Sequence, residues 1–193
     1  MSSLSRAISI TENISQRTFK RHDLIPLQPE MLLHIDRGVV RTVTWSEEGI
    51  MVTLGYWGAG DVVGQPLSNI QPYQVECITS VEISYVPSHC QERVLTGICQ
   101  HVQQAEELLS IIRQTSARDR LLQVLLWLAR KFARPVERGK LIDLRLTHQE
   151  IAEFIGMTRV SVTRLLSQLE QEGIISRPRR HFIVLLDRQS QSA

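Results

Sequence analysis

Arg159 and Arg164 are the residues of this chain whose type and spacing most directly suggest chemistry. An arginine guanidinium can donate two hydrogen bonds at once to O6 and N7 of guanine, and hydroxyl side chains suit phosphates or base edges. At about 100° per residue, a helix over residues 158–169 has one mainly polar face. That face consists of Val160, Thr163, Arg164 and Ser167, with Arg159 at its flank. Val160 is its apolar exception, and a thymine methyl in the major groove would give it a contact. The pattern predicts a helix that reads DNA bases.

A second predicted helix and a sharp turn precede this one. Thr147 and Glu150 have the spacing of a capping box, which marks a helix N-terminus. Gly156 ends that helix, and Thr158 caps the next one. Apolar residues keep helical spacing on both sides of the turn: Ile151, Ala152 and Ile155, then Val162, Leu165, Leu166 and Leu169. The segment therefore predicts a helix-turn-helix that fits a major groove, in preference to a solvated helix with two incidental arginines.

Charge is divided unevenly between the two halves of the chain. Its 193 residues include 22 Lys and Arg and 20 Asp and Glu, a formal net charge of +2. Residues 117–193 contain 14 basic and 8 acidic side chains (+6), whereas residues 1–116 contain 8 and 12 (−4). This asymmetry predicts that a polyanion binds the C-terminal half.

Other function classes find little support in the sequence. The six histidines are scattered, and no H-E-x-x-H, G-x-S-x-G or phosphate-loop motif occurs, so we expect no enzymatic activity, no metal and no cofactor. Cys77, Cys90 and Cys99 lack C-x-x-C spacing, and we expect mostly buried apolar residues rather than disulfides or zinc ligands. The absence of a membrane-length apolar run and of a signal peptide predicts a cytoplasmic protein.

The first half of the chain has the pattern of a small β domain. Short β-type runs separated by Gly and Pro turns occupy residues 31–35, 39–45, 50–56, 74–78 and 81–86. Strands of this length and spacing predict a sandwich or a jelly-roll barrel.

The period becomes helical after residue 88. Apolar residues recur at spacings of 3, 4, 3, 4 and 3, namely Leu95, Ile98, Val102, Ala105, Leu109 and Ile112. Such a seam is typical of a two-stranded coiled coil and predicts a symmetric dimer. The alternative is a helix that packs on its own β domain.

Three elements are expected around the helix-turn-helix. Residues 119–132 predict a helix that Pro135 and Gly139 close, followed by a short hairpin around residues 141–146. Beyond the recognition helix, apolar runs at 173–175 and 182–186 bracket the basic residues 177–181. This predicts a wing whose Arg179 and Arg180 contact phosphate, the alternative being a merely solvated basic turn.

With these elements in order, the chain resembles the Crp/Fnr regulators along its whole length. Residues 34–41 (HIDRGVVR), Gly49 and residues 60–64 (GDVVG) are similar to the barrel turns of that family, and residues 158–166 (TRVSVTRLL) to its cyanobacterial NtcA-type nitrogen regulators. The resemblance implies an α+β fold with three parts. These are an N-terminal β jelly-roll domain (residues 1–87), a dimerisation helix (88–116) and a C-terminal winged helix-turn-helix domain (117–193).

The resemblance also implies roles for single residues. Arg159 and Arg164 would read guanines, Val160 stands where many relatives carry glutamate, and Thr147, His148 and Gln149 would approach the DNA backbone. The complete set of expected DNA contacts is Thr147, His148, Gln149, Thr158, Arg159, Val160, Ser161, Thr163, Arg164, Arg179 and Arg180.

The sequence departs from relatives that bind cyclic AMP. Those relatives have a Gly-Glu pair near the position of Gly64-Gln65, followed by an arginine for the phosphate. Here no Lys or Arg occurs between residues 42 and 92, a stretch that contains six carboxylates. A buried phosphate without a cation is costly, so we expect no cyclic nucleotide. The same absence counts against 2-oxoglutarate, the effector of the NtcA type, although Arg113 and Arg118 could still supply charge. The cysteine cluster of the family's iron–sulfur sensors is also missing.

The sequence thus predicts a homodimeric DNA-binding transcription regulator of palindromic operators with GTA and TAC arms. Its expected partners are double-stranded DNA, a second copy of the chain and RNA polymerase, with no membrane. The effector is unknown and is either not a nucleotide or absent. An NtcA-like regulator controlled by 2-oxoglutarate and a protein-interaction adaptor without DNA binding are the alternatives.

Overall fold

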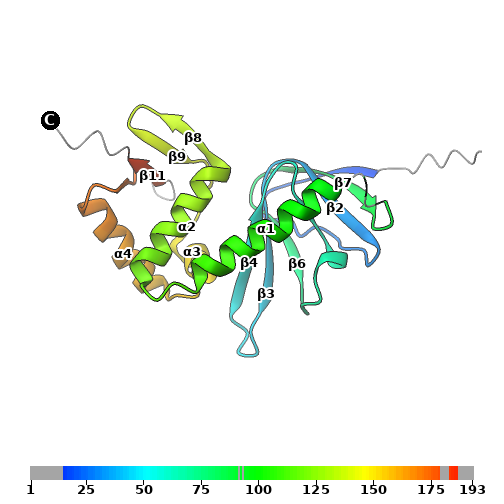
Figure 1. The fold of residues 1–193 in the computed structure, drawn as a ribbon, viewed down its shortest axis with the longest axis horizontal. Coiled ribbons are helices and arrows are strands. Elements are labelled where there is room, and N and C mark those ends of the chain that lie inside the picture. Colours follow the sequence, from blue (N-terminus) through cyan, green and yellow to red (C-terminus); the bar gives the residue numbers. More distant parts are fainter. Residues whose placement is uncertain (1–14, 91, 93, 179–182, 187–193) are drawn as a thin grey trace, which may run out of the picture.

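Two antiparallel sheets form the N-terminal part of the structure, a computed structural model that describes residues 15–90, 92, 94–178 and 183–186 (Figure 1). One sheet has the strand order β1-β7-β2-β5 and the other β4-β3-β6. The strands are β1 (Ser15–Phe19), β2 (Met31–Arg37), β3 (Val40–Trp45), β4 (Met51–Trp57), β5 (Val62–Val63), β6 (Gln74–Cys77) and β7 (Val81–Pro87). Side chains from both sheets share one core, which includes Leu33, Val40, Trp57 and Ile83, so the predicted jelly-roll fold is confirmed.

Two of these strands were not predicted. The first four residues of β1 are polar and exposed, and only Phe19 is apolar, whereas β5 has only two residues. Neither strand therefore has a period-2 apolar pattern. A single 3-10 turn (Gln65–Leu67) follows β5. The predicted burial of the cysteines holds for Cys77 but not for Cys99, which is exposed.

Helix α1 (Leu95–Ile112) coincides with the predicted apolar seam and is shorter than the predicted helical range of residues 88–116. It packs on the barrel at Gly97, where a Cβ would stand 2.4 Å from Val62 Cγ2, whereas its buried Leu108 and Ile111 belong to the core of the C-terminal part. Its predicted seam lies on another face, where Leu95, Val102 and Leu109 are 52–58% exposed. The helix therefore does pack on its own β domain, as the alternative proposed, and still presents the apolar seam to the outside.

The C-terminal part contains three helices and a small sheet. Its elements are α2 (Ala117–Phe132), β8 (Ala133–Val136), β9 (Gly139–Ile142), α3 (His148–Ile155), α4 (Arg159–Gln171), β10 (Ile175–Ser176) and β11 (Ile183–Leu186), with the strand order β10-β11-β9-β8. Its core also includes Tyr56 and Ile78 of the barrel and Leu108 of α1. None of the described helices is long and apolar enough to cross a membrane.

The hairpin before the helix-turn-helix differs from the prediction. It spans residues 133–142, not 141–146, and Pro135 and Gly139 belong to it rather than to the end of α2. Proline is tolerated in β8 because this is the edge strand of its sheet. Gly139 has a φ of 149° and lies so close to β11 that a Cβ would stand 1.9 Å from the carbonyl oxygen of Leu185. The prediction that Pro135 and Gly139 end the preceding helix is therefore wrong, because both residues lie in strands of the small sheet.

Candidate nucleic-acid interface

Local hydrogen bonds fix the start of each helix in the α3–α4 pair. The Thr147 hydroxyl accepts the Glu150 N–H at 3.1 Å, and the Glu150 carboxylate accepts the Thr147 N–H at 2.7 Å, which confirms the capping box. Gly156 ends α3 in the left-handed conformation, with φ 64°. The Thr158 hydroxyl then accepts the Ser161 N–H at 3.1 Å and caps α4. The buried residues of α4 are Val162, Leu165, Leu166 and Leu169, as the apolar spacing predicted.

The opposite face of α4 is open to solvent. A shallow hollow of about 400 Å³ is lined by Arg159, Val160, Thr163, Arg164 and Ser167. Val160 is 77% exposed, an unusual position for a valine. Within the described residues, no carboxylate lies within ion-pair distance of either Arg159 or Arg164. Both guanidinium groups can therefore bind an anion or a base edge without first breaking an ion pair.

The N-terminus of α3 lies beside this face. His148 Nδ1 is 2.8 Å from the hydroxyl of Thr163, which brings the first residue of α3 against the outward side of α4. Gln149 is exposed and donates to Glu153 within its own helix. Thr158 and Ser161 differ from the other expected contacts, because their hydroxyl groups bond to one another at 2.9 Å as part of the cap.

One arginine of the predicted basic wing, Arg177, forms contacts within the protein. Arg177 donates to Glu170 of α4 through Nε at 2.9 Å and through Nη2, and to the Ser167 hydroxyl at 3.3 Å. This pairing holds the pKa of the Glu170 carboxyl below its usual value. Arg177 thus ties the wing to the recognition helix, while Arg179 and Arg180 lie outside the described residues.

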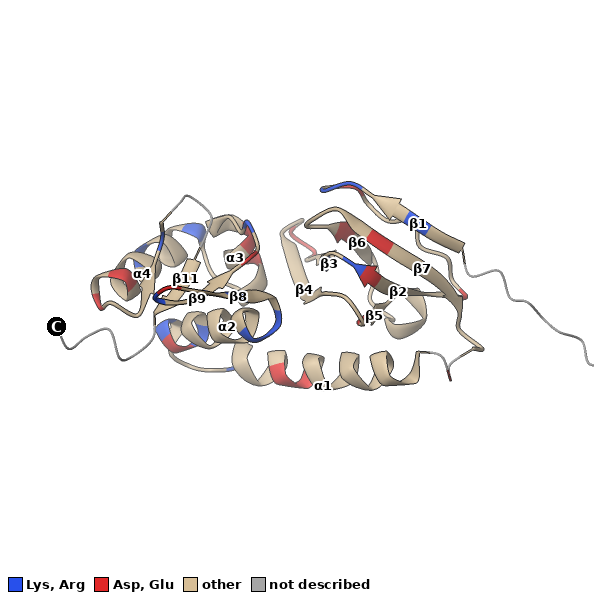
Figure 2. Ribbon diagram, turned by 90° about the horizontal axis from the view of Figure 1, so that it is seen from above, with Lys and Arg blue, Asp and Glu red and all other residues tan. Residues whose placement is uncertain are grey.

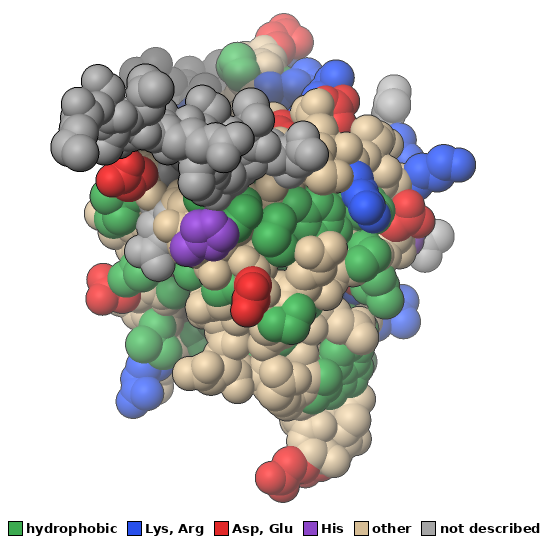
Figure 3. Space-filling view, turned by 90° about the vertical axis from the view of Figure 1, so that its right-hand side faces the viewer, with side chains coloured by type: hydrophobic (Ala, Val, Ile, Leu, Met, Phe, Trp, Pro, Cys, Tyr) green, Lys and Arg blue, Asp and Glu red, His purple; other side chains and the backbone are tan. Residues whose placement is uncertain are grey.

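Basic side chains gather in the C-terminal part of the molecule. In Figure 2 basic positions mark the ribbon of α2, the β8–β9 hairpin and the α3–α4 region, whereas the barrel carries both acidic and basic positions. Figure 3 shows the barrel end remote from α4, where the visible Lys and Arg side chains are dispersed around the rim. The charge asymmetry of the sequence is therefore also an asymmetry in space.

Comparisons with known proteins agree with this arrangement. The family profile of the Crp-like helix-turn-helix domain matches residues 119–190. The regulatory protein CysR of Synechococcus elongatus is 42% identical over 167 residues, which cover 85% of this chain and 81% of that relative. The global nitrogen regulator of Nostoc is 32% identical over 179 residues, covering 82% and 80%.

The chain belongs to the Crp/Fnr family of transcription regulators. A solved Crp/Fnr-family regulator from Thermus thermophilus has the same fold, with a TM-score of 0.74 and 25% identity over 91% of this chain and 95% of that one. Regulators with this type of helix-turn-helix bind DNA and act as dimers. The resemblance read from the sequence is thus confirmed at the level of the family.

In this Crp/Fnr member the barrel interior is largely filled by its own side chains. Trp57 stacks on His101 of α1 with ring centroids 4.1 Å apart, and its indole N–H donates to the Thr42 hydroxyl at 3.0 Å. The cavity beside this stack has a volume of about 230 Å³, below the range of about 300–1,000 Å³ that is usual for ligand pockets. None of its lining residues is Lys or Arg.

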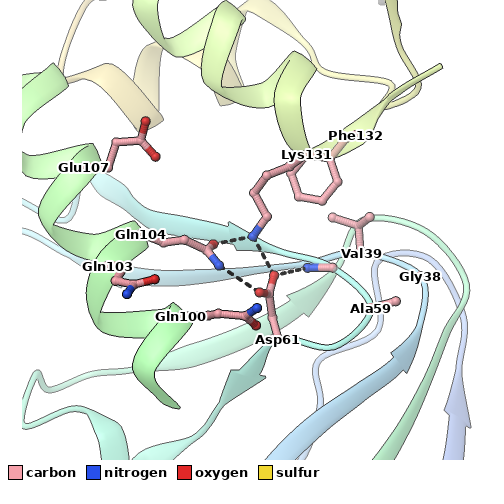
Figure 4. A pocket seen from close by; sticks show the side chains of 11 residues that line it. Gly38, Val39, Ala59, Asp61, Gln100, Gln103, Gln104, Glu107, Lys131 and Phe132 are labelled. Atoms are coloured by element: carbon pink, nitrogen blue, oxygen red, sulfur yellow. Dashed lines mark hydrogen bonds and ion pairs between the residues drawn. The ribbon is translucent and has the colours of Figure 1, made fainter. Parts of the chain in front are cut away.

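Arg113 and Arg118, which could have supplied positive charge to an anionic effector, do not line the barrel cavity. Arg118 pairs with Glu172 at the end of α4 and is therefore part of the DNA-binding domain. Arg113 is exposed at the end of α1. Lys131 of α2 does reach the barrel edge, which sequence reasoning missed, and it borders a hollow of about 520 Å³ beside α1 (Figure 4). Its ammonium is bound by Asp61 at 2.6 Å and by Gln104, so its charge is already compensated.

The Trp57–His101 stack makes stability depend on pH. Burial lowers the pKa of His101 below its ordinary value, and the ring donates from Nδ1 to the Val62 carbonyl at 3.0 Å. At pH values between this lowered pKa and about 6.5, the imidazole of His101 is protonated in the unfolded chain but neutral in the folded chain. We expect the free energy of unfolding to fall as the pH decreases through this window. His101→Gln should have a flatter pH dependence in urea titrations from pH 7.5 to 5.5, and an unchanged slope would contradict the buried neutral imidazole.

Proposed function

We propose that this protein is a homodimeric regulator that binds palindromic operators sequence-specifically and has no nucleotide effector. The observation that carries the proposal is the outward face of α4, where two arginines flank a highly exposed valine and pair with no carboxylate of the described residues. Guanine and the thymine methyl are the base-edge groups that suit these side chains. Thr147, His148 and Gln149 lie at the start of α3 beside this face, and we expect them to contact phosphates on the groove edge.

The exposed seam of α1 supports the homodimer. Four residues of this seam are exposed, namely Leu95, Val102, Ala105 and Leu109. Ile112 is half-buried, and Ile98 is half-buried against barrel residues that include Leu32 and Val62. A second copy related by a two-fold axis along α1 would bury this seam and orient two α4 helices for successive major grooves. Half-sites about 10 base pairs apart follow from that symmetry.

Effector control by a bound nucleotide has little physical basis in this barrel. The residual cavity is small, none of its lining residues is Lys or Arg, and the stacked rings of Trp57 and His101 form part of its wall. Control by 2-oxoglutarate is less favoured for the same reason, because a dicarboxylate needs positive partners. The adaptor alternative is disfavoured by Arg159 and Arg164, since an adaptor without DNA binding has no use for two uncompensated arginines on α4.

Further parts of the proposal rest on the family. Its relatives are transcriptional regulators, so we infer no enzymatic activity, a cytoplasmic location and contact with RNA polymerase. The direct test is to sequence genomic DNA fragments that the purified protein retains. Enrichment of a palindrome with GTA and TAC arms supports the proposal, and retention without any sequence preference overturns it.

Base readout by Arg159 can be separated from charge. Arg159→Ala should weaken binding to the selected operator by about 1–3 kcal/mol, because a bidentate contact to guanine is lost. Binding to scrambled DNA should change far less. The matched control is Arg138→Ala, which removes the same charge from the exposed β8–β9 turn. Equal losses on operator and scrambled duplex in fluorescence anisotropy would make Arg159 a phosphate contact only.

The seam can be tested with one charge. Leu109→Glu should give monomers in multi-angle light scattering, because a carboxylate would be buried against its symmetry mate. Affinity for the full palindrome should collapse, while binding to a half-site stays weak and measurable. Gln103→Glu adds the same charge to an exposed position outside the seam and should remain dimeric. A dimeric Leu109→Glu would place the interface elsewhere.

If Val160 contacts a thymine methyl, the affinity for the operator should depend on that methyl group. Replacing the arm thymine by uracil removes only this methyl, so binding of the wild-type protein should weaken. Val160→Ala should be nearly indifferent to the same replacement. If uracil leaves the wild type unaffected, or if the selected arms resemble TGTGA, the role given to Val160 is wrong.

A further inference from the structure

The apolar seam of α1 has two flanks with different surroundings. In heptads that start at Leu95, the seam residues occupy positions a and d, and positions e and g lie on either side of them. The e flank is exposed to solvent and consists of Cys99, Glu106 and Arg113. On the g flank, Val94 and Leu108 are buried and His101 is half-buried. The g flank therefore faces the core of its own copy, and the e flank faces away from it.

A parallel two-stranded coiled coil brings these flanks together. Position g of one helix then faces position e of the other helix, five residues further along. The resulting contacts join Val94 to Cys99, His101 to Glu106 and Leu108 to Arg113 of the second copy. Only the middle pair consists of two groups that can take opposite charges. The pairing of the helices thus contains one specific polar contact, which two-fold symmetry repeats.

Glu106 has no cationic partner in the described part of its own copy. No Lys or Arg side chain there lies within ion-pair distance of its carboxylate, whereas the neighbouring Glu107 pairs with Arg130. Glu106 is exposed and directly follows the seam residue Ala105. Charged side chains beside an apolar seam are those that form ion pairs between the helices of a coiled coil. The carboxylate is therefore available to a basic group of a second copy.

His101 offers a matching group on the other flank. Its Nδ1 lies 3.0 Å from the Val62 carbonyl oxygen, and because a carbonyl only accepts, Nδ1 carries the hydrogen. Protonation adds a second hydrogen at Nε2, for which the described residues provide no acceptor. Burial lowers the pKa of His101, and the charged groups of its own copy oppose one another, because Asp61 raises this pKa and Lys131 lowers it. A carboxylate from a second copy would stabilise the charged ring.

The same ring connects the seam with the barrel interior. His101 and Trp57 are stacked with their planes 4° apart, and both border the small barrel cavity together with the seam residue Ala105. Trp57 in turn donates to the Thr42 hydroxyl of β3. A side chain that binds His101 across the seam therefore contacts a group that is packed against two barrel strands.

We propose that α1 pairs in parallel and in register with α1 of a second copy, and that Glu106 of each copy binds the imidazole of His101 in the other. The pair sets the register, because a shift of one heptad would place Cys99 or Arg113 opposite His101 instead. It also brings the helix of each copy against the Trp57 stack of the other. The inference rests on the proposed homodimer and names the residues that fix its register.

The pair makes dimerisation depend on pH. The carboxylate of the second copy raises the pKa of His101 in the dimer above its value in the monomer, so dimerisation takes up protons. The contribution of the pair to dimer stability is complete below the monomer pKa and is lost as the pH rises through the higher dimer pKa. Acidification through this window should therefore strengthen the dimer.

The experiment follows the titration of His101 by NMR in protein with isotope-labelled histidines. The spectrum of His101→Gln identifies the signal. In the wild-type dimer, His101 should titrate at a higher pH than in Glu106→Gln, which keeps the side-chain size and removes the charge. In the monomeric Leu109→Glu background, Glu106→Gln should have no effect, because the acceptor belongs to the other copy. The matched control Glu107→Gln removes a charge from heptad position f, remote from the seam, and should titrate as wild type.

Dimer affinity provides an independent measurement. Glu106→Gln should raise the dissociation constant of the dimer about threefold at pH values where His101 is protonated, and should leave it nearly unchanged where the ring is neutral. In a His101→Gln background the same substitution should have no effect at either pH. Sedimentation velocity over a series of concentrations gives these constants.

Two results overturn the proposal. The first is a His101 titration that Glu106→Gln leaves unchanged although the wild type is dimeric and Leu109→Glu monomeric. The second is an equal change in monomer and dimer, which would show that Glu106 acts on the ring of its own copy. Failure of the proposed homodimer is recognised separately, because Leu109→Glu would then remain dimeric or the wild type itself would be a monomer.

Discussion

A buried guanidinium joins the DNA-binding half of this protein to its barrel. Arg41 of β3 is 6% exposed and binds Glu76 of β6 at 2.8 Å and Glu153 of α3 at 3.2 Å. Removing one partner of such a buried ion pair typically costs about 3–5 kcal/mol, because the remaining charge stays desolvated. Phe154, next in sequence, packs edge-on against Tyr56 of the barrel. Helix α3 therefore has a defined orientation on the barrel, and α4 takes its orientation from α3.

A second ion pair connects α2 with the barrel, and the same lysine also binds α1. Lys131 of α2 binds Asp61 at the end of the barrel and Gln104 of α1, and its ammonium also lies within 5.5 Å of the ring centroids of Trp57 and Trp127. Burial lowers the pKa of this lysine, while the bond to Asp61 opposes that shift. The two ion pairs attach the C-terminal part to the barrel, and the second one also attaches it to α1 through Gln104. Reorienting α4 requires breaking at least one of them.

The parts of the molecule that local patterns determine were predictable from the sequence. The α1 stripe, the capping box at Thr147 and the apolar spacing of α4 each depend on residues a few positions apart. The hairpin at 133–142 was misplaced, because Pro135 and Gly139 have one meaning at a helix end and another at a sheet edge. The interdomain contacts were beyond reach for a different reason. Arg41 and Glu153 are 112 residues apart, and no local sequence pattern around either residue indicates that they form a pair.

These contacts bear on how a signal could act. Trp57 and His101 already join the barrel to α1, and Arg41 and Lys131 already join the barrel to the DNA-binding domain. A ligand shifts a conformational equilibrium only by its difference in affinity between the two states. A ligand that would bridge the same elements therefore gains little here, because protein side chains occupy those positions. A signal that opens the interface must instead outweigh a buried ion pair.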